Sequence, residues 1–288
     1  MAKLSFGIKT MPQYTTYEDI LRVWREADAI PAYEHAWLFD HFFPIGDMDP
    51  SGPCFEGWTL LAALAAQTER LRVGLMVTGN TYRHPAVLAN MAATVDIVSR
   101  GRLDFGIGAG WNELEHSAYG IPLYAPGERI GRLREACEVI KRMWTEEAPD
   151  FDGRYYQLKG ARCEPKPVQK PYPSFVIGGG GEHKTLRVVA EYADIWNFSG
   201  GGVDDFRHKN AVLDQHCAAV GRDPASIARS VQWITDPAHL DTTRAALRDF
   251  ISAGATHLVI YLRAPFPEGI ARRAADEIIE PLRAEFGA

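Results

Sequence analysis

Short apolar runs alternate along the chain with longer segments whose apolar residues recur at helical spacing. Runs such as 4–8, 72–77 and 103–108 have the length and character of strands buried on both faces. Segments such as 17–29 and 85–98 carry apolar residues three and four positions apart, which is typical of an amphipathic helix. This alternation predicts parallel strands joined by helices.

Eight strand-and-helix pairs can be followed along the 288 residues. The other five strands are expected at 36–39, 174–178, 195–198, 231–235 and 257–262. Eight units close a (β/α)8 TIM barrel, whereas a doubly wound open sheet usually has fewer strands. We therefore predict an α/β fold in which residues 1–288 form a single TIM-barrel domain.

The repeat is interrupted once, in a segment with five prolines and a predicted hairpin at Asp152-Gly153. We interpret this segment, about 146–173, as an insertion after the fourth βα unit. Residues 42–54 and 109–128 are predicted to be loops, and the last helix is predicted from about Glu268 to Phe286.

Composition narrows the possible partners and locations. The net charge is −6 and no basic run occurs, so neither nucleic acid nor an anionic membrane surface is an expected partner. The longest apolar run, 60–66, is too short to span a bilayer, and the N-terminus lacks the apolar core of a signal peptide, so we expect a cytoplasmic protein. The four cysteines lie far apart without zinc spacing and are expected to be reduced.

Candidate chemistry begins where the strand at 36–39 ends, with Asp40 and His41. Active sites of TIM barrels lie at the carboxyl ends of their strands, which favours a catalytic interpretation of this pair. A structural hydrogen bond or a helix cap is the alternative. Glu113, Glu115 and His116 lack a further ligand at suitable spacing, so we predict no metal site.

Two glycine clusters follow strands. Gly106, Gly108 and Gly110 do not form a dinucleotide fingerprint, because Trp111 stands where part of that motif is required. The run 178–181 opens a helix predicted at 182–193, with Lys184 nearby. Both clusters could simply be tight turns. The more specific interpretation is that a backbone without side chains admits a flat ring and a phosphate group.

Four stretches together resemble one known family. They are WLFDHF, VGLMVTGNTYRHPAVLANMAATVD, GRLDFGIGAGWNELEHSAYGIP and FVIGGGGEHKTLRVVAEYADIWN. In these the chain is similar to the bacterial luciferase-like oxidoreductases, in particular to the actinobacterial branch that uses the deazaflavin coenzyme F420. The similarity extends from the first strand to the last helix.

The resemblance implies a coenzyme held at the carboxyl face of the barrel, with the Asp40–His41 pair against the deazaflavin ring. It also implies a non-prolyl cis peptide at Met76-Val77, followed by Thr78, behind the ring. The remaining implied coenzyme contacts are Gly108, Gly110, Trp111 and Asn112 beside the ring and tail, and Gly178, Gly179, Gly180 and Gly181 at the phosphate.

One position departs from the family pattern. The sugar-phosphate dehydrogenases of the family have a glutamate where this chain has Trp111, which weakens the case for sugar-phosphate oxidation. Glu113, two residues further on, is the candidate replacement for that acid.

These observations give one main hypothesis and two alternatives. The main one is an F420-dependent oxidoreductase that moves a hydride between C5 of the deazaflavin and a small organic substrate. His41 would be the general acid or base, and Asp40 would orient it or hold the edge of the ring. The alternatives are an FMN-dependent monooxygenase and a non-catalytic coenzyme-binding barrel. The resemblance also implies a homodimer.

Overall fold

The strands of the chain form a closed parallel barrel. The structure is a computed structural model that describes residues 3–198 and 200–287. The barrel strands are β1 (Ser5–Thr10), β2 (His35–Leu38), β3 (Arg72–Leu75), β4 (Thr78–Gly79), β5 (Leu103–Gly108), β8 (Ser174–Gly178), β9 (Ile195–Phe198), β10 (Ala228–Thr235) and β11 (His257–Leu262). They follow the order β3-β2-β1-β11-β10-β9-β8-β5-β4, and a further pairing of β3 with β5 closes the sheet.

The described part of the chain has eight strand positions, because β3 and β4 are two parts of one strand. Both parts pair with β5, and the Met76-Val77 peptide between them is cis. The predicted (β/α)8 TIM barrel is confirmed by this closure. The cis bond implied at Met76-Val77 is likewise present.

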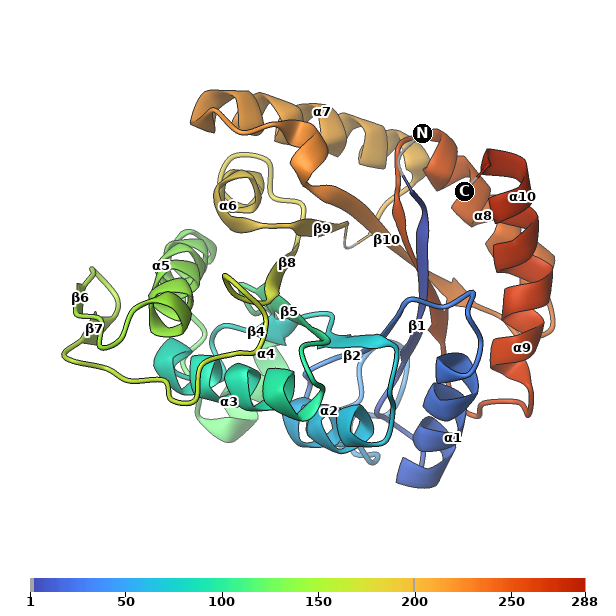
Figure 1. The fold of residues 1–288 in the computed structure, drawn as a ribbon, viewed down its shortest axis with the longest axis horizontal. Helices are drawn as coiled ribbons and strands as arrows, with labels where there is room; N and C mark the ends of the chain where they lie inside the picture. The colour runs from blue at the N-terminus through green and yellow to red at the C-terminus, as the bar shows by residue number, and fades with distance from the viewer. Residues whose placement is uncertain (1–2, 199, 288) are drawn as a thin grey trace.

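Helices surround the barrel, as Figure 1 shows. They are α1 (Tyr17–Asp28), α2 (Gly57–Ala66), α3 (Pro85–Val98), α4 (Glu113–Tyr119), α5 (Pro126–Thr145), α6 (Thr185–Tyr192), α7 (Val203–Val220), α8 (Leu240–Ser252), α9 (Ile270–Ala274) and α10 (Glu280–Phe286). Among the described residues, no helix has both the length and the apolar character that crossing a bilayer requires.

Several strand bounds differ by up to three residues from the sequence prediction, and three helical segments differ as well. The expected loop at 109–128 contains helix α4, which the Asn112 side chain caps by accepting from the Glu115 amide at 3.3 Å. Helix α6 begins at Thr185 instead of 182. The last helix is divided by a π-helical turn at Ala275–Ile279. This turn comes directly before α10, whose proline lacks the N–H that a regular α-helix requires.

The segment 146–173 contains the expected hairpin, with β6 (Phe151–Asp152) paired antiparallel to β7 (Gln157–Leu158). In Figure 1 this hairpin projects away from the barrel, beyond helix α5. That the whole segment is an insertion stays a prediction.

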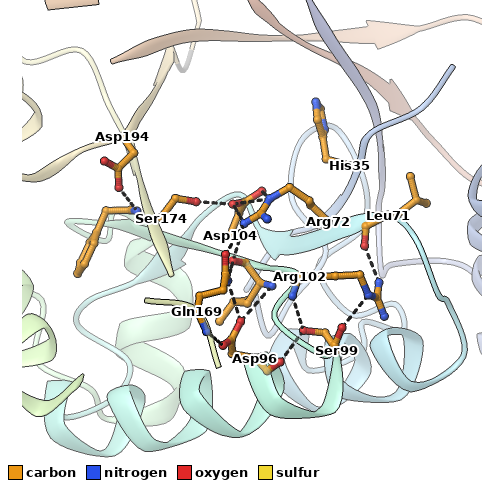
Figure 2. A network of polar contacts seen from close by, with 12 residues as sticks. His35, Leu71, Arg72, Asp96, Ser99, Arg102, Asp104, Gln169, Ser174 and Asp194 are labelled. Atoms are coloured by element: carbon orange, nitrogen blue, oxygen red, sulfur yellow. Dashed lines mark hydrogen bonds and ion pairs between the residues drawn. The ribbon is translucent and has the colours of Figure 1, made fainter. Parts of the chain in front are cut away.

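A polar network closes the amino-terminal end of the barrel, opposite the site described below (Figure 2). Arg72, the first residue of β3, donates from Nε to the Asp104 carboxylate of β5 at 2.8 and 3.0 Å. Gln169 donates to Asp96 at 2.7 Å and to the Leu103 carbonyl oxygen at 2.6 Å, which fixes the end of the 146–173 segment against the barrel. At this face of a TIM barrel, such contacts support stability.

Candidate functional site

A cavity of about 580 Å³ opens at the carboxyl ends of the barrel strands. Residues from β1, β4, β5, β8, β9, β10 and β11 line it, together with the segments after β2, β3 and β5 and the first turn of α5. Of the residues singled out from the sequence, the cavity is lined by Asp40, His41, Met76, Val77, Thr78, Gly108, Gly110, Trp111, Gly178 and Gly179. The two glycine clusters thus border one cavity.

Along one wall of the cavity, glycines surround the Val77 side chain. A Cβ atom at Gly108 would lie 2.8 Å from Val77 Cγ2, and one at Gly178 would lie 3.1 Å from the same atom. A Cβ atom at Gly106 would lie 1.8 Å from the Leu75 carbonyl oxygen. Side chains at these positions would push the wall apart, so glycine is required for β5 and β8 to approach the segment that contains the cis peptide.

His41 faces the cavity and is held from behind by a buried carboxylate. Its Nδ1 lies 2.9 Å from Glu115 Oε2, and Glu115 Oε1 accepts from the Phe42 and Phe43 amides at 2.6 and 3.1 Å. The Tyr82 hydroxyl also donates to Glu115. Burial opposes ionisation of Glu115, but the hydrogen bonds from His41 and Tyr82 outweigh it and lower the pKa of this carboxyl. The carboxylate can only accept, so Nδ1 donates and Nε2 remains free for a ligand.

Asp40 is buried and already paired. Its carboxylate accepts two hydrogen bonds from Arg83, at 2.6 and 3.0 Å, and another from the Thr78 hydroxyl. Arg83 in turn pairs with Glu56. Burial raises the pKa of the Asp40 carboxyl and the Arg83 guanidinium opposes that effect. Asp40 is therefore suited to fixing the exit of β4 beside the cavity, and Arg83 limits its capacity to take up a proton.

Lys9 forms part of the cavity floor and was not singled out from the sequence. Its side chain is 4% exposed, and Nζ donates to the Met76 carbonyl oxygen at 3.1 Å and to Gln232 Oε1 at 2.8 Å. The ammonium also lies 4.3 Å from the centre of the Tyr261 ring. Burial lowers the pKa of Lys9 to about 7. In the sequence, Lys9 simply follows the apolar run 4–8, and nothing in this pattern indicates that its amine is buried.

Another part of the cavity lining combines glycine backbone, the start of a helix and a cation. Gly178, Gly179 and Thr185 line the cavity beside the start of α6, which has no side-chain cap. Arg129, from the first turn of α5, donates to the Gly110 carbonyl oxygen at 2.5 Å, and its buried Nε has no hydrogen-bond partner among the described residues. Uncapped amides and a free guanidinium N–H are suited to an anion.

Four of the predicted site residues do not line this cavity: Asn112, Glu113, Gly180 and Gly181. Asn112 caps α4 instead, and Glu113 is exposed on that helix. Glu115, two residues further on, is the buried acid beside His41. The signal that could have identified it is the helix start at Asn112 and the stop at Gly120, since a helix here turns residue 115 inward. Of the described residues, none form a cluster of three or more metal-binding side chains.

The sequence is similar to those of several known oxidoreductases. A sequence profile of the luciferase-like monooxygenases matches residues 2–280. The F420-dependent glucose-6-phosphate dehydrogenase of Kineococcus radiotolerans is 38% identical over 218 residues, which are 73% of this chain and 63% of that protein. The FMNH2-dependent dimethylsulfone monooxygenase of Pseudomonas putida is 30% identical over 205 residues, which are 68% of this chain and 53% of that protein. The chain thus spans less than two thirds of the length of both relatives.

The barrel also matches solved structures over nearly its whole length. The coenzyme F420-dependent tetrahydromethanopterin reductase of Methanopyrus kandleri superimposes with a TM-score of 0.82 and 18% sequence identity, covering 98% of this chain and 100% of that one. At this identity the likeness establishes the fold. The cavity lies where ligands bind in barrels of this kind, at the carboxyl ends of the strands.

Proposed function

Since the chain belongs to the luciferase-like monooxygenase family, we propose that it is an F420-dependent oxidoreductase that transfers a hydride between C5 of the deazaflavin and a small organic substrate. The observation that carries this proposal is the glycine-bordered wall at Val77, which faces one cavity together with His41 and a group of N–H donors suited to an anion. An F420-dependent relative at 38% identity supports the choice of coenzyme.

The residues present fit such a coenzyme at both of its ends. The planar ring would lie on the Met76-Val77 wall, which Gly178 borders, and the phosphate would be held by Gly179 and Arg129. When bound, the coenzyme supplies the hydride chemistry, and the protein contributes positioning and proton transfer.

His41 is the proposed general acid or base. Its Nδ1 is engaged by the ionised Glu115, so Nε2 would give a proton to a substrate carbonyl oxygen or take one from a substrate hydroxyl. Trp111 packs edge-on to the imidazole, with 5.3 Å between the ring centres. Asp40 would hold the wall through Thr78 and Arg83 instead of exchanging protons.

The lining near His41 points to a substrate with little charge. Phe39, Ile45 and Trp111 line the cavity beside the imidazole, and no carboxylate stands at position 111. A small alcohol or carbonyl compound with an apolar body fits this lining better than a sugar phosphate.

The first test is coenzyme binding, measured by fluorescence-quenching titration with oxidised F420 and, separately, with FMN. We expect saturable binding of F420 and weaker binding of FMN. The FMN-dependent monooxygenase is the second candidate, favoured by the Pseudomonas putida relative, and the reverse order of affinities would establish it in place of our proposal.

The second test addresses catalysis. His41→Ala should reduce the rate of F420 reduction by a responsive alcohol about 100-fold or more and change coenzyme affinity less than threefold. His239→Ala is the matched control, because His239 is exposed and does not line the cavity. Equal rates in the wild type and His41→Ala would refute the assigned role, and tight F420 binding without reduction by any alcohol tested would identify a non-catalytic coenzyme-binding barrel.

A further inference from the structure

Two cations line the cavity without a carboxylate partner. They are Lys9 on the floor and Arg129 on the rim, and neither forms an ion pair within residues 3–198 and 200–287. The two acids of the site are occupied elsewhere, Asp40 by Arg83 and Glu115 by His41. The cavity therefore contains two positive groups that no carboxylate in the described part of the chain pairs with, and Arg129 already has a proposed ligand in the coenzyme phosphate.

The position of Lys9 links it to the ring-binding wall. Its Nζ donates to the Met76 carbonyl oxygen, which belongs to the cis peptide itself. Gln232 from β10 and the Tyr261 ring from β11 hold the amine from the other side. The ammonium is thus fixed directly beneath the segment against which the ring would lie.

Hydride transfer changes the charge at this wall. A hydride carries two electrons with one proton, so its transfer would make the net charge of the ring more negative by one before any proton is taken up. The charge develops in a cavity where burial keeps the effective dielectric low, and a fixed cation there is worth more than in water.

We propose that Lys9 stabilises the anionic reduced form of the ring and so favours binding of the reduced over the oxidised coenzyme. This inference rests on the proposed F420-dependent function and deepens it, by assigning the residue that sets the redox preference of the site. The titratable and charged groups that line the same cavity are Asp40, His41, Tyr82, Arg129 and Tyr261. Because burial alone lowers the pKa of Lys9, an arriving negative charge would favour its protonated form.

The test compares dissociation constants for oxidised and chemically reduced F420, by anaerobic fluorescence titration of the purified protein. Lys9→Met removes the charge and the hydrogen bond to Met76, whereas Lys9→Gln removes the charge and keeps an N–H donor. Both should weaken binding of the reduced form at least tenfold more than that of the oxidised form. A tenfold change in this ratio is equivalent to a shift of about 30 mV in the two-electron midpoint potential.

Arg129→Gln is the matched control, because Arg129 is the other cation that lines the cavity without a carboxylate partner among the described residues. It should weaken both redox forms by a similar factor, because the phosphate is present in both. If both Lys9 variants bind with the wild-type ratio, or if Lys9→Gln alone retains it, the role of the charge is refuted. If the wild type binds neither form of F420, the proposed function fails and this inference fails with it. Should Lys9→Met not fold, Lys9→Gln decides the question by itself.

Discussion

A buried lysine without a carboxylate partner should lower the stability of the folded chain. The ordinary pKa of lysine is 10.5 and burial lowers that of Lys9 to about 7. At about 1.4 kcal/mol for each factor of ten in proton affinity, the folded state disfavours the charged amine by about 5 kcal/mol at pH values below 7. The hydrogen bonds to Met76 and Gln232 return about 1 kcal/mol each.

The direction of the pH dependence follows from the two pKa values. Between about pH 7 and 10.5 the unfolded chain binds a proton at Lys9 that the folded chain does not, so this residue makes the protein more stable as the pH rises. Lys9→Met removes that effect. We therefore expect Lys9→Met to be more stable than the wild type by about 2–3 kcal/mol at pH 6, and expect this gain to fall by about 2–3 kcal/mol at pH 9.

The measurement is the free energy of unfolding from urea titrations of both proteins at pH 6, 7.5 and 9. Lys159→Met is the matched control, because Lys159 is exposed and lies far from the cavity on the hairpin segment. It should show no pH-dependent difference from the wild type. A stability difference for Lys9→Met that is independent of pH would refute the argument, since it would mean that the folded and unfolded states bind the lysine proton equally well.

Two further substitutions test Glu115, which contacts His41, and His257, the buried first residue of β11. Glu115→Gln should lower the turnover rate about 10- to 100-fold with little change in coenzyme affinity, because the amide no longer fixes the imidazole of His41. Glu113→Gln is the control, because Glu113 is exposed, and it should match the wild type. Equal losses of turnover in both variants would contradict the role of Glu115. Burial lowers the pKa of His257 to about 4, so the free energy of unfolding should fall as the pH drops from about 6.5 towards 4. His257→Phe should reduce this loss between pH 7 and 4.5 by about 2–3 kcal/mol, measured in urea titrations. An unchanged loss would show that other groups cause it.

The fold could be predicted because each barrel strand is marked by local sequence. The strands at Ser174–Gly178 and His257–Leu262 were predicted at the bounds the structure has, since apolar runs there end at glycine or at polar loops. Helix α4 was missed because seven residues are too few to show a periodic pattern, and its start depends on one capping side chain. The π-helical turn in the last helix leaves no local signal, because the apolar spacing around Ile278 continues through it.

The site could be predicted only where its chemistry follows a strand directly. Asp40 and His41 follow β2 at once, so the barrel geometry brings them to the cavity. Glu115 and Lys9 are determined by contacts across 74 and 67 positions of sequence, with His41 and Met76 respectively. No spacing rule connects such pairs, and Glu113 was chosen because it is closer to the glycine cluster, although helix α4 turns it to solvent.

The local charges of the cavity, and not the net charge of −6, determine which ligand the site favours. Asp40 and Glu115 are acids held within the site by Arg83 and His41, whereas Lys9 has no carboxylate partner in the part of the chain that the structure describes. The net charge of −6 is the reason that we expect extended polyanions, which bind over a whole face, to be poor partners. A small anion is bound over a few ångströms, where one desolvated cation outweighs distant surface carboxylates that solvent and salt screen. An acidic protein can therefore hold an anionic reduced ring, provided that a cation such as Lys9 is buried next to it.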